Sequence, residues 1–169
     1  GIRANRTLLE AIRPQADGIT KNLGYFKKAL AYDYTVGIIE TREQLASITA
    51  GLASLQSERQ TKDDFFVLAK EEIRKQIGDQ PADVRYRLFL ANLLTSFGAV
   101  EDAVIELEKG IAISPHKEQF YYLLGDVYIA LGKYEKAFET YRVPFDKEPG
   151  NSRARQLVAV AAVYAGKDN

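Results

Sequence analysis

The 169-residue sequence has no cysteine, no methionine and no tryptophan, and it has a single histidine. Without cysteine the chain forms no disulfide and offers no thiolate to a metal. Without methionine its first residue is not a translation initiator, so we expect a processed product or a part of a longer polypeptide. The acidic residues show no metal-ligand spacing, and we expect neither a metal nor a cofactor.

Charge of one sign and long apolar runs are missing as well. Lys plus Arg and Asp plus Glu number 23 each, so the net charge is zero and no overall field favours nucleic acid. The longest apolar run, residues 157–165, is far shorter than the roughly 20 residues that a membrane span needs. Residues 1–6 lack the apolar core of a signal peptide. We expect no nucleic-acid partner and no membrane insertion.

Candidate catalytic groups are few. The one histidine, His116, follows a proline in a predicted turn, which favours a solvated side chain over a catalytic base. Asp63-Asp64 and Glu71-Glu72 are adjacent acids, and we expect them at a helix start and on an exposed helix face. Phosphate-binding glycine loops and serine nucleophile elbows are absent from the sequence. The sequence predicts no catalytic residue, and we expect a protein that is not an enzyme.

Several residue types recur at intervals of 34 positions. They are Ala69, Ala103 and Ala137; Pro81, Pro115 and Pro149; Phe66, Val100 and Tyr134; Ile73, Leu107 and Tyr141; and Ile77, Ile111 and Phe145. A 34-residue period is typical of the tetratricopeptide repeat (TPR), a helix–turn–helix unit that stacks into a solenoid. The sequence resembles this family, and the resemblance predicts an all-α, right-handed helical solenoid of about nine helices.

The repeat positions have physical roles. Ala103 and Ala137 are small residues, which we expect where the two helices of a repeat approach closely. Gly98 and Gly132 are expected to end the first helix of each repeat in a left-handed conformation. Pro144 lies inside a predicted second helix, where it cannot donate a backbone hydrogen bond. We therefore predict a kink or a break between residues 140 and 144.

The two halves of the chain differ in regularity. Residues 1–60 form a helical, degenerate repeat-like segment, and residues 61–169 form TPR repeats with a lone terminal helix at 152–165, all in one continuous domain. Thr41 and Thr61 are each followed three residues later by Gln or Asp. This spacing resembles a capping box, so we predict that helices begin near both threonines.

The TPR resemblance also implies a binding face, because the first helix of each repeat lines the concave side of the solenoid. The positions in that register are Arg85, Leu88, Phe89, Asn92, Gln119, Tyr122, Leu123 and Asp126. Some TPR proteins hold a peptide's terminal carboxylate there with Lys, Asn and Arg, but Leu88 and Tyr122 do not offer such groups. We expect a groove for an extended or helical segment of a peptide or protein. Alternatively, its aromatic residues only pack against neighbouring helices.

The terminal helix predicts self-association. Residues 157–165 are apolar on all sides, and no second helix follows to cover them. We expect the N-terminal helices of another copy to do so, through Leu8, Leu9, Ile12 and Phe26 on one copy and Val160, Val163 and Tyr164 on the other. Head-to-tail contacts of this kind build open filaments, or rings where the rotation closes. A truncated chain or a half-exposed terminal helix are the alternatives.

A second resemblance covers nearly the whole chain. Residues 4–11 read Ala-Asn-Arg-Thr-Leu-Leu-Glu-Ala, residues 26–30 Phe-Lys-Lys-Ala-Leu, residues 41–45 Thr-Arg-Glu-Gln-Leu and residues 164–166 Tyr-Ala-Gly. This order resembles the soluble tail that follows the last membrane span of bacterial O-antigen ligase-like proteins, whose catalytic part lies in the membrane. The resemblance implies an accessory interaction domain of an envelope glycan-assembly protein.

Two functions stay open from the sequence. The first is a self-assembling extracellular scaffold, and the second is the accessory domain. Both place the chain outside the cell or in the cell envelope, with the cytoplasm as the alternative.

Overall fold

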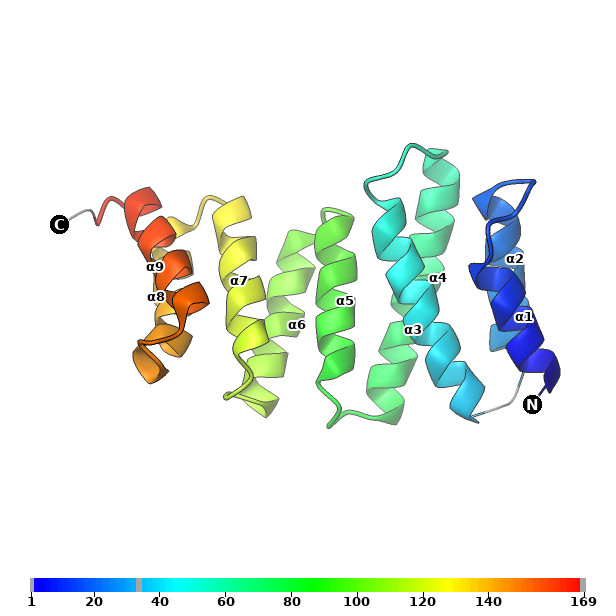
Figure 1. The fold of residues 1–169 in the computed structure, drawn as a ribbon, viewed down its shortest axis with the longest axis horizontal. Helices are drawn as coiled ribbons and strands as arrows, with labels where there is room; N and C mark the ends of the chain where they lie inside the picture. Colours follow the sequence, from blue (N-terminus) through cyan, green and yellow to red (C-terminus); the bar gives the residue numbers. More distant parts are fainter. Residues whose placement is uncertain (1, 33–34, 168–169) are drawn as a thin grey trace. The chain divides into compact units, whose positions relative to one another are not determined.

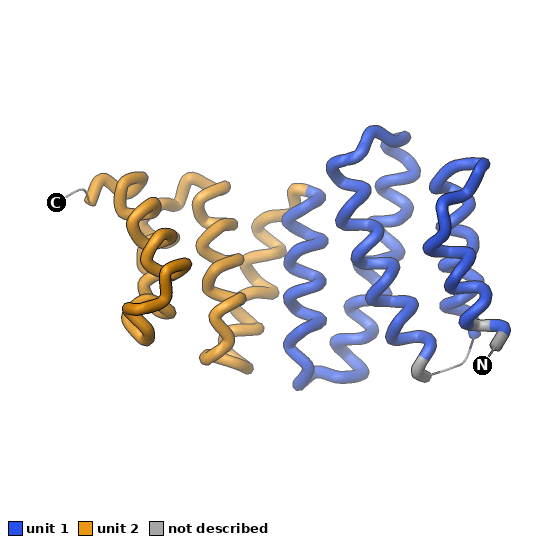
Figure 2. Tube along the Cα trace, viewed as in Figure 1, with its two compact units in different colours: residues 1–97 blue, residues 98–169 orange. Residues whose placement is uncertain are grey.

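The computed structural model describes residues 2–32 and 35–167, and in these residues every regular element is an α-helix (Figure 1). The chain divides into two compact units, Gly1–Phe97 (unit 1) and Gly98–Asn169 (unit 2) (Figure 2). The helices of unit 1 are α1 (Ile2–Ile12), α2 (Ile19–Leu30), α3 (Thr35–Leu52), α4 (Arg59–Asp79) and α5 (Arg85–Ser96). Those of unit 2 are α6 (Val100–Ile113), α7 (Glu118–Ala130), α8 (Tyr134–Lys147) and α9 (Ser152–Tyr164). The prediction of an all-α fold is confirmed for the described residues.

Unit 1 is built from neighbouring helices that bury one apolar side each. The α1/α2, α3/α4 and α4/α5 pairs pack together. Phe26 of α2 meets Phe65 of α4 edge to face, with ring centroids 6.3 Å apart, and both rings are fully buried. The side chain of Asn22 donates hydrogen bonds to the carbonyls of Ala11 and Arg13, at 2.7 and 2.6 Å. It thereby satisfies carbonyls that α1 leaves open at its C-terminus.

Unit 2 shows why small residues recur in the repeat. A Cβ atom placed on Gly125 would collide with the ring of Tyr141, and one on Gly110 would collide with the ring of Phe120. Glycine at these two positions therefore lets an aromatic ring of a neighbouring helix lie against the backbone. Ala103 and Ala137 are fully buried.

The glycine turns agree with the prediction. Gly98 and Gly132 have φ angles of 78° and 69°, the left-handed region that glycine adopts without steric cost. Gly132 follows α7, and its backbone N–H donates to the carbonyl of Ile129 at 2.9 Å. Each glycine thus ends a first helix and turns the chain into the second helix of its repeat.

Neither threonine caps a helix, although α4 begins close to Thr61, at Arg59. Thr41 lies well inside α3, which begins at Thr35, and its buried hydroxyl donates to the carbonyl of Gly37 at 2.6 Å. Thr61 is the third residue of α4, where its hydroxyl lies 3.2 Å from that of Thr20 on α2. Both hydroxyls are satisfied without capping, because a helical threonine can bond to the carbonyl four residues back or across to another helix.

The break predicted at Pro144 is also wrong. α8 runs without interruption from Tyr134 to Lys147, and Pro144 is buried within it. The backbone N–H of Glu148 donates to the carbonyl of Pro144 at 3.0 Å, which is the hydrogen bond to the fourth residue back that is expected in an α-helix. One missing hydrogen bond is outweighed by the packing of α8, where Tyr141 is also buried. A kink without a break stays a prediction.

Glu72, one member of the acidic pair Glu71-Glu72, is buried although the sequence predicts that it is exposed. Glu71 is exposed, but Glu72 is buried between α3 and α4, where Arg42 donates to it at 3.0 Å. The same guanidinium donates to Gln76 at 2.7 Å and to Asp79 at 2.9 Å. The expectation of an exposed pair is therefore wrong for Glu72, because these three α4 residues share the side that faces Arg42.

The division into units differs from the division by repeat regularity. The compact units meet between Phe97 and Gly98, whereas the irregular segment of the sequence was expected to end at residue 60. The boundary at residue 60 and the right-handed superhelix stay predictions. None of the described helices is long and apolar enough to cross a membrane.

Candidate protein-interaction surfaces

Four of the predicted groove positions lie on α5 in unit 1. Arg85, Phe89 and Asn92 are exposed and Leu88 is half-buried. Arg85 is held by Asp83 just before the helix, through nitrogen–oxygen distances of 2.6 and 3.0 Å. This surface thus offers one exposed aromatic ring beside polar side chains.

The other four groove positions lie on α7 in unit 2. Gln119 and Asp126 are exposed, Leu123 is half-buried and Tyr122 is buried at 5% exposure. The hydroxyl of Tyr122 donates to Glu118 at 2.9 Å. Because the eight positions are divided between the two units, their grouping into a single groove stays a prediction.

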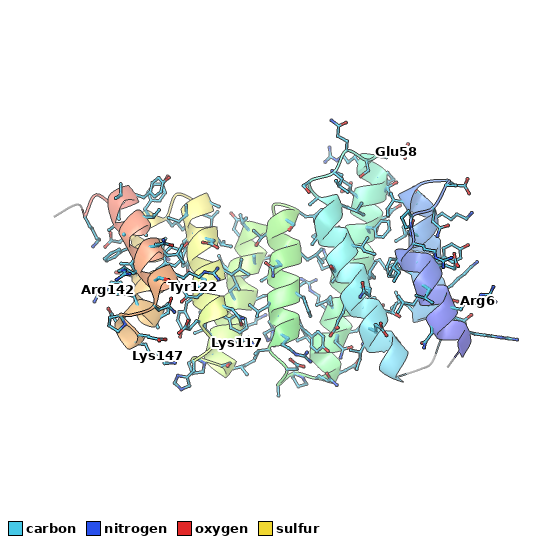
Figure 3. The ribbon with its side chains drawn as sticks, in the orientation of Figure 1. Arg6, Glu58, Lys117, Tyr122, Arg142 and Lys147 are labelled. Atoms are coloured by element: carbon cyan, nitrogen blue, oxygen red, sulfur yellow. The ribbon has the colours of Figure 1, made fainter. Side chains whose placement is uncertain are left out.

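Tyr122 belongs to a contact between α7 and α9 (Figure 3). The side-chain amide of Asn151, just before α9, donates to the Tyr122 hydroxyl at 3.1 Å and to Glu118 at 3.2 Å. The guanidinium of Arg153 lies over the Tyr122 ring, 4.5 Å from its centroid. Burial, followed by the hydrogen bond to Glu118, raises the pKa of Tyr122. Its role is therefore to join helices, and sequence reasoning missed Asn151 and Arg153.

Asp126 has a structural partner as well. The hydroxyl of Tyr141 on α8 donates to the Asp126 carboxylate at 2.5 Å. Burial is the main cause that raises the pKa of Tyr141, and the hydrogen bond to Asp126 adds to it. Asp126 thus ties α7 to α8 while its residue stays exposed.

α9 exposes an apolar stripe. Val160, Val163 and Tyr164 are 51%, 63% and 55% exposed, whereas Ala154 and Ala161 of the same helix are buried. α9 packs on α8. The helix is therefore covered on one side, and the three large residues predicted for self-association are accessible.

The C-terminal end of the stripe is fixed by contacts with α8. The ring of Tyr164 stacks on Tyr134, with centroids 5.2 Å apart. Lys167 pairs with Glu135 at 2.7 Å and lies 4.9 Å from the centroid of Phe138. These contacts hold the end of α9 in place without covering Val160 or Val163.

The predicted N-terminal partners fall into two groups. Leu9 and Ile12 on α1 are exposed, at 54% and 39%, and they line a small hollow beside Glu40 of α3. Leu8 and Phe26 are buried in the core of unit 1, although Leu8 still lines part of this hollow.

The described residues hold no group of three or more His, Cys, Asp or Glu side chains that could bind a metal ion. His116 is exposed, and so are Asp63 and Asp64. Among the described residues the surfaces that the structure offers are therefore apolar stripes and charged helix faces.

Comparison with known proteins supports the repeat assignment. The tetratricopeptide repeat family matches residues 94–161. No curated protein sequence matches the chain. Among solved structures, MamA is 22% identical with a TM-score of 0.65, over 88% of this chain and 80% of MamA.

Two further solved structures have the same fold. TTC0263, a thermophilic TPR protein of Thermus thermophilus, is 13% identical with a TM-score of 0.65, over 95% of this chain and 99% of that protein. PcrH, crystallised with the chaperone-binding region of PopB, is 18% identical with a TM-score of 0.51, over 74% of this chain and 94% of PcrH. Residues 94–161 match the tetratricopeptide repeat family, and the all-α fold is similar to that of solved TPR proteins.

Proposed function

We propose that this chain is a non-enzymatic TPR scaffold whose copies associate head to tail into a filament, tube or ring outside the cell or in its envelope. The observation that carries the proposal is the exposed stripe of Val160, Val163 and Tyr164 on α9. A protein-interaction role is what the TPR fold supports in general. The stripe adds a particular surface on which a second copy can dock.

The driving force of this contact is apolar burial. Covering apolar surface stabilises a contact by about 25 cal/mol per Å². In the neighbouring copy the matching surface is the exposed part of α1 around Leu9 and Ile12, with the hollow beside Glu40 next to it. Because the two surfaces are different, the contact is heterologous and repeats from copy to copy.

The second candidate function is the accessory interaction domain of an O-antigen ligase-like envelope protein. It is favoured by the polar and aromatic positions on the first helices of the repeats, of which Phe89, Asn92 and Gln119 are exposed. In this candidate the partner is a peptide or protein segment held in the groove, and the chain itself remains a monomer.

Light scattering coupled to size-exclusion chromatography, together with negative-stain imaging, tests the proposal. We expect the wild-type chain to form particles that grow with concentration and that appear as filaments, tubes or rings. A chain that remains monomeric up to millimolar concentration contradicts self-association and leaves the accessory domain.

A further inference from the structure

Positive charge is concentrated at the N-terminal end of a chain with no net charge. Residues 1–32 contain six basic residues and two acidic ones. Arg6 lies on α1 and Arg13 directly follows it, and both are exposed. The backbone N–H of Arg13 still donates to the carbonyl of Leu9 at 3.2 Å, which continues the helical turn, and its guanidinium lies 3.5 Å from the carboxylate of Glu10. Figure 3 shows Arg6 on the outer side of α1. Leu9 lies between them and is 54% exposed.

α6 in unit 2 carries the opposite pattern. It contains four acidic residues and one lysine, and that lysine, Lys109, pairs with Glu106 at 3.1 Å. Glu101 and Glu108 are exposed and lie seven positions apart, and Glu108 also accepts a hydrogen bond from the hydroxyl of Tyr128 at 3.3 Å. Ile105, between them, is 49% exposed although it is a large apolar residue. α6 thus presents an apolar side chain between two carboxylates.

We propose that the arginine side of α1 in one copy docks antiparallel on the acidic face of α6 in another copy. Seven residues span about 10.5 Å along a helix, so the arginine pair and the glutamate pair have matching separations. Antiparallel pairing sets Leu9 against Ile105, Arg6 against Glu108, and Arg13 against Glu101. A parallel arrangement would instead bring Glu10 to Ile105, between two carboxylates.

This contact and the proposed end contact share Leu9, so the α1 of one copy forms one of them at a time. The end contact buries apolar side chains around Leu9 and Ile12 and on α9, whereas the contact between α1 and α6 depends on ion pairs at an exposed surface. Exposed ion pairs are screened by salt, because the Debye length falls from about 10 Å at 0.1 M to about 3 Å at 1 M. The inference therefore predicts an association between copies that low salt strengthens and high salt weakens.

A second copy is the occupant that the structure favours. Arg6 and Arg13 also suit an anionic lipid surface. Such a surface does not account for the acidic face of α6, with its exposed Ile105 and its matching spacing of charges. The chain itself holds both complementary patterns.

Charge reversal of the full chain tests the inference. The first variant is Arg6→Glu with Arg13→Glu, and the second is Glu101→Arg with Glu108→Arg. Sedimentation velocity at about 0.05 M and about 0.5 M salt then measures association. We expect the low-salt association constant of each variant alone to fall about tenfold or more, since attraction becomes repulsion at two positions. Mixing the two variants should restore it, because each then offers the charge that the other needs.

A matched control reverses charges on another exposed surface. Glu139→Arg with Lys147→Glu changes two exposed side chains on α8 and should leave association unchanged. Circular dichroism melts of all variants show whether each chain is folded. A variant that fails to fold is replaced by its charge-neutral form, Arg6→Gln with Arg13→Gln or Glu101→Gln with Glu108→Gln, which should weaken association in the same direction.

Several results would overturn the inference. The inference is overturned if a mixture of the two variants stays dissociated. It is also overturned if a change of salt concentration does not alter association of the wild type. Binding of the wild type to vesicles with about one third phosphatidylserine, lost on reversal of Arg6 and Arg13 but kept on reversal of α6, assigns the arginines to lipid instead.

The inference and the proposed function fail in different ways. Assembly that persists at high salt and ignores charge reversal overturns only the α1–α6 contact. Assembly that dissolves fully at high salt and follows the charge exchange supports this contact and overturns the apolar end contact. A wild-type chain that is monomeric at both salt concentrations overturns both.

Discussion

Tyrosine hydroxyls join the helices of unit 2 through carboxylates. Tyr141 of α8 donates to Asp126 of α7 at 2.5 Å, and Tyr128 of α7 donates to Glu108 of α6 at 3.3 Å. Burial raises the pKa of both phenols, and the carboxylates raise it further. The ring of Tyr141 thus lies beside Gly125, and that of Tyr128 is buried, while both hydroxyls remain hydrogen-bonded.

The raised pKa of Tyr141 predicts a stability that falls at alkaline pH. An unfolded tyrosine loses its proton near pH 10, whereas folded Tyr141 keeps it, so the unfolded state binds fewer protons above that pH. The contribution is fully present below pH 10 and is lost as the pH rises beyond it. Urea unfolding of wild type and Tyr141→Phe between about pH 8 and pH 11.5 measures this. The wild type should lose more stability over this range, and equal losses would contradict the account.

The small residues at the helix crossings give a second prediction. Ala137 is fully buried on α8, so Ala137→Leu should overpack the contact and lower the free energy of unfolding by about 1–3 kcal/mol. Glu139, two residues along the same helix, is exposed, and Glu139→Leu should change it by less than about 0.5 kcal/mol. Thermal melts of the two variants measure the difference. Similar melting temperatures would show that Ala137 does not lie at a close crossing.

At this scale the sequence predicts the residues whose role follows from size or backbone conformation. Gly98, Gly132 and Ala137 are where the repeat spacing places them, because left-handed turns and close contacts accept few other residues. The burial of Tyr122 and Glu72 was missed. Their environment depends on partners far along the chain, Asn151 and Arg42, which no local pattern indicates.

The cap of α9 is the best-defined end of an element in unit 2. The side-chain oxygen of Asn151 accepts hydrogen bonds from the backbone N–H groups of Arg153 and Ala154, at 3.1 and 3.2 Å. Its amide nitrogen donates to Glu118 and Tyr122 of α7. One residue therefore both starts the helix and attaches it to its neighbour.

Removing this cap should loosen α9. We expect Asn151→Ala to lower the free energy of unfolding by about 1–2 kcal/mol, since it leaves two helix N–H groups without their acceptor. Hydrogen exchange should show the loss of protection mainly in α9. Ser152→Ala, at the adjacent exposed position, serves as the control and should have little effect. Unchanged protection of α9 in Asn151→Ala would contradict the role of the cap.

The sequence predicted the type of the secondary-structure elements better than the residues at which they begin and end. The helical period and the spacing of 34 predict the described helices, but Thr41 and Thr61 mislead because threonine hydroxyls have other ways to be satisfied inside a helix. Pro144 misleads because tertiary packing holds α8 together across one missing hydrogen bond. Local helix propensity gives the energetic cost of such a residue in a helix, and the tertiary packing around it decides whether the helix continues.

On the scale of the whole molecule, the two kinds of contact proposed here respond differently to salt. Apolar burial on α9 persists when salt is raised, while the ion pairs of Arg6 and Arg13 with α6 are screened. Because both contacts use Leu9, low salt should favour the α1–α6 contact, and high salt should leave the assemblies that the end contact holds.

The self-association surfaces were predictable from the sequence only in part. The exposed stripe on α9 follows from an apolar helix that its own repeat covers on one side. The burial of Leu8 and Phe26 did not follow, because it depends on how α1 and α2 pack into unit 1. Which surface a second copy covers stays a prediction.

Sedimentation velocity at about 0.5 M salt tests the central claim most directly, because it isolates the apolar end contact. The wild type should sediment as oligomers that grow with concentration. Val160→Asp with Val163→Asp should sediment as a folded monomer, since the contact would bury unpaired carboxylates. Val67→Asp with Val143→Asp, two exposed valines of other helices, should assemble like the wild type. A monomeric wild type, or an α9 variant that assembles as the wild type does, would contradict the account.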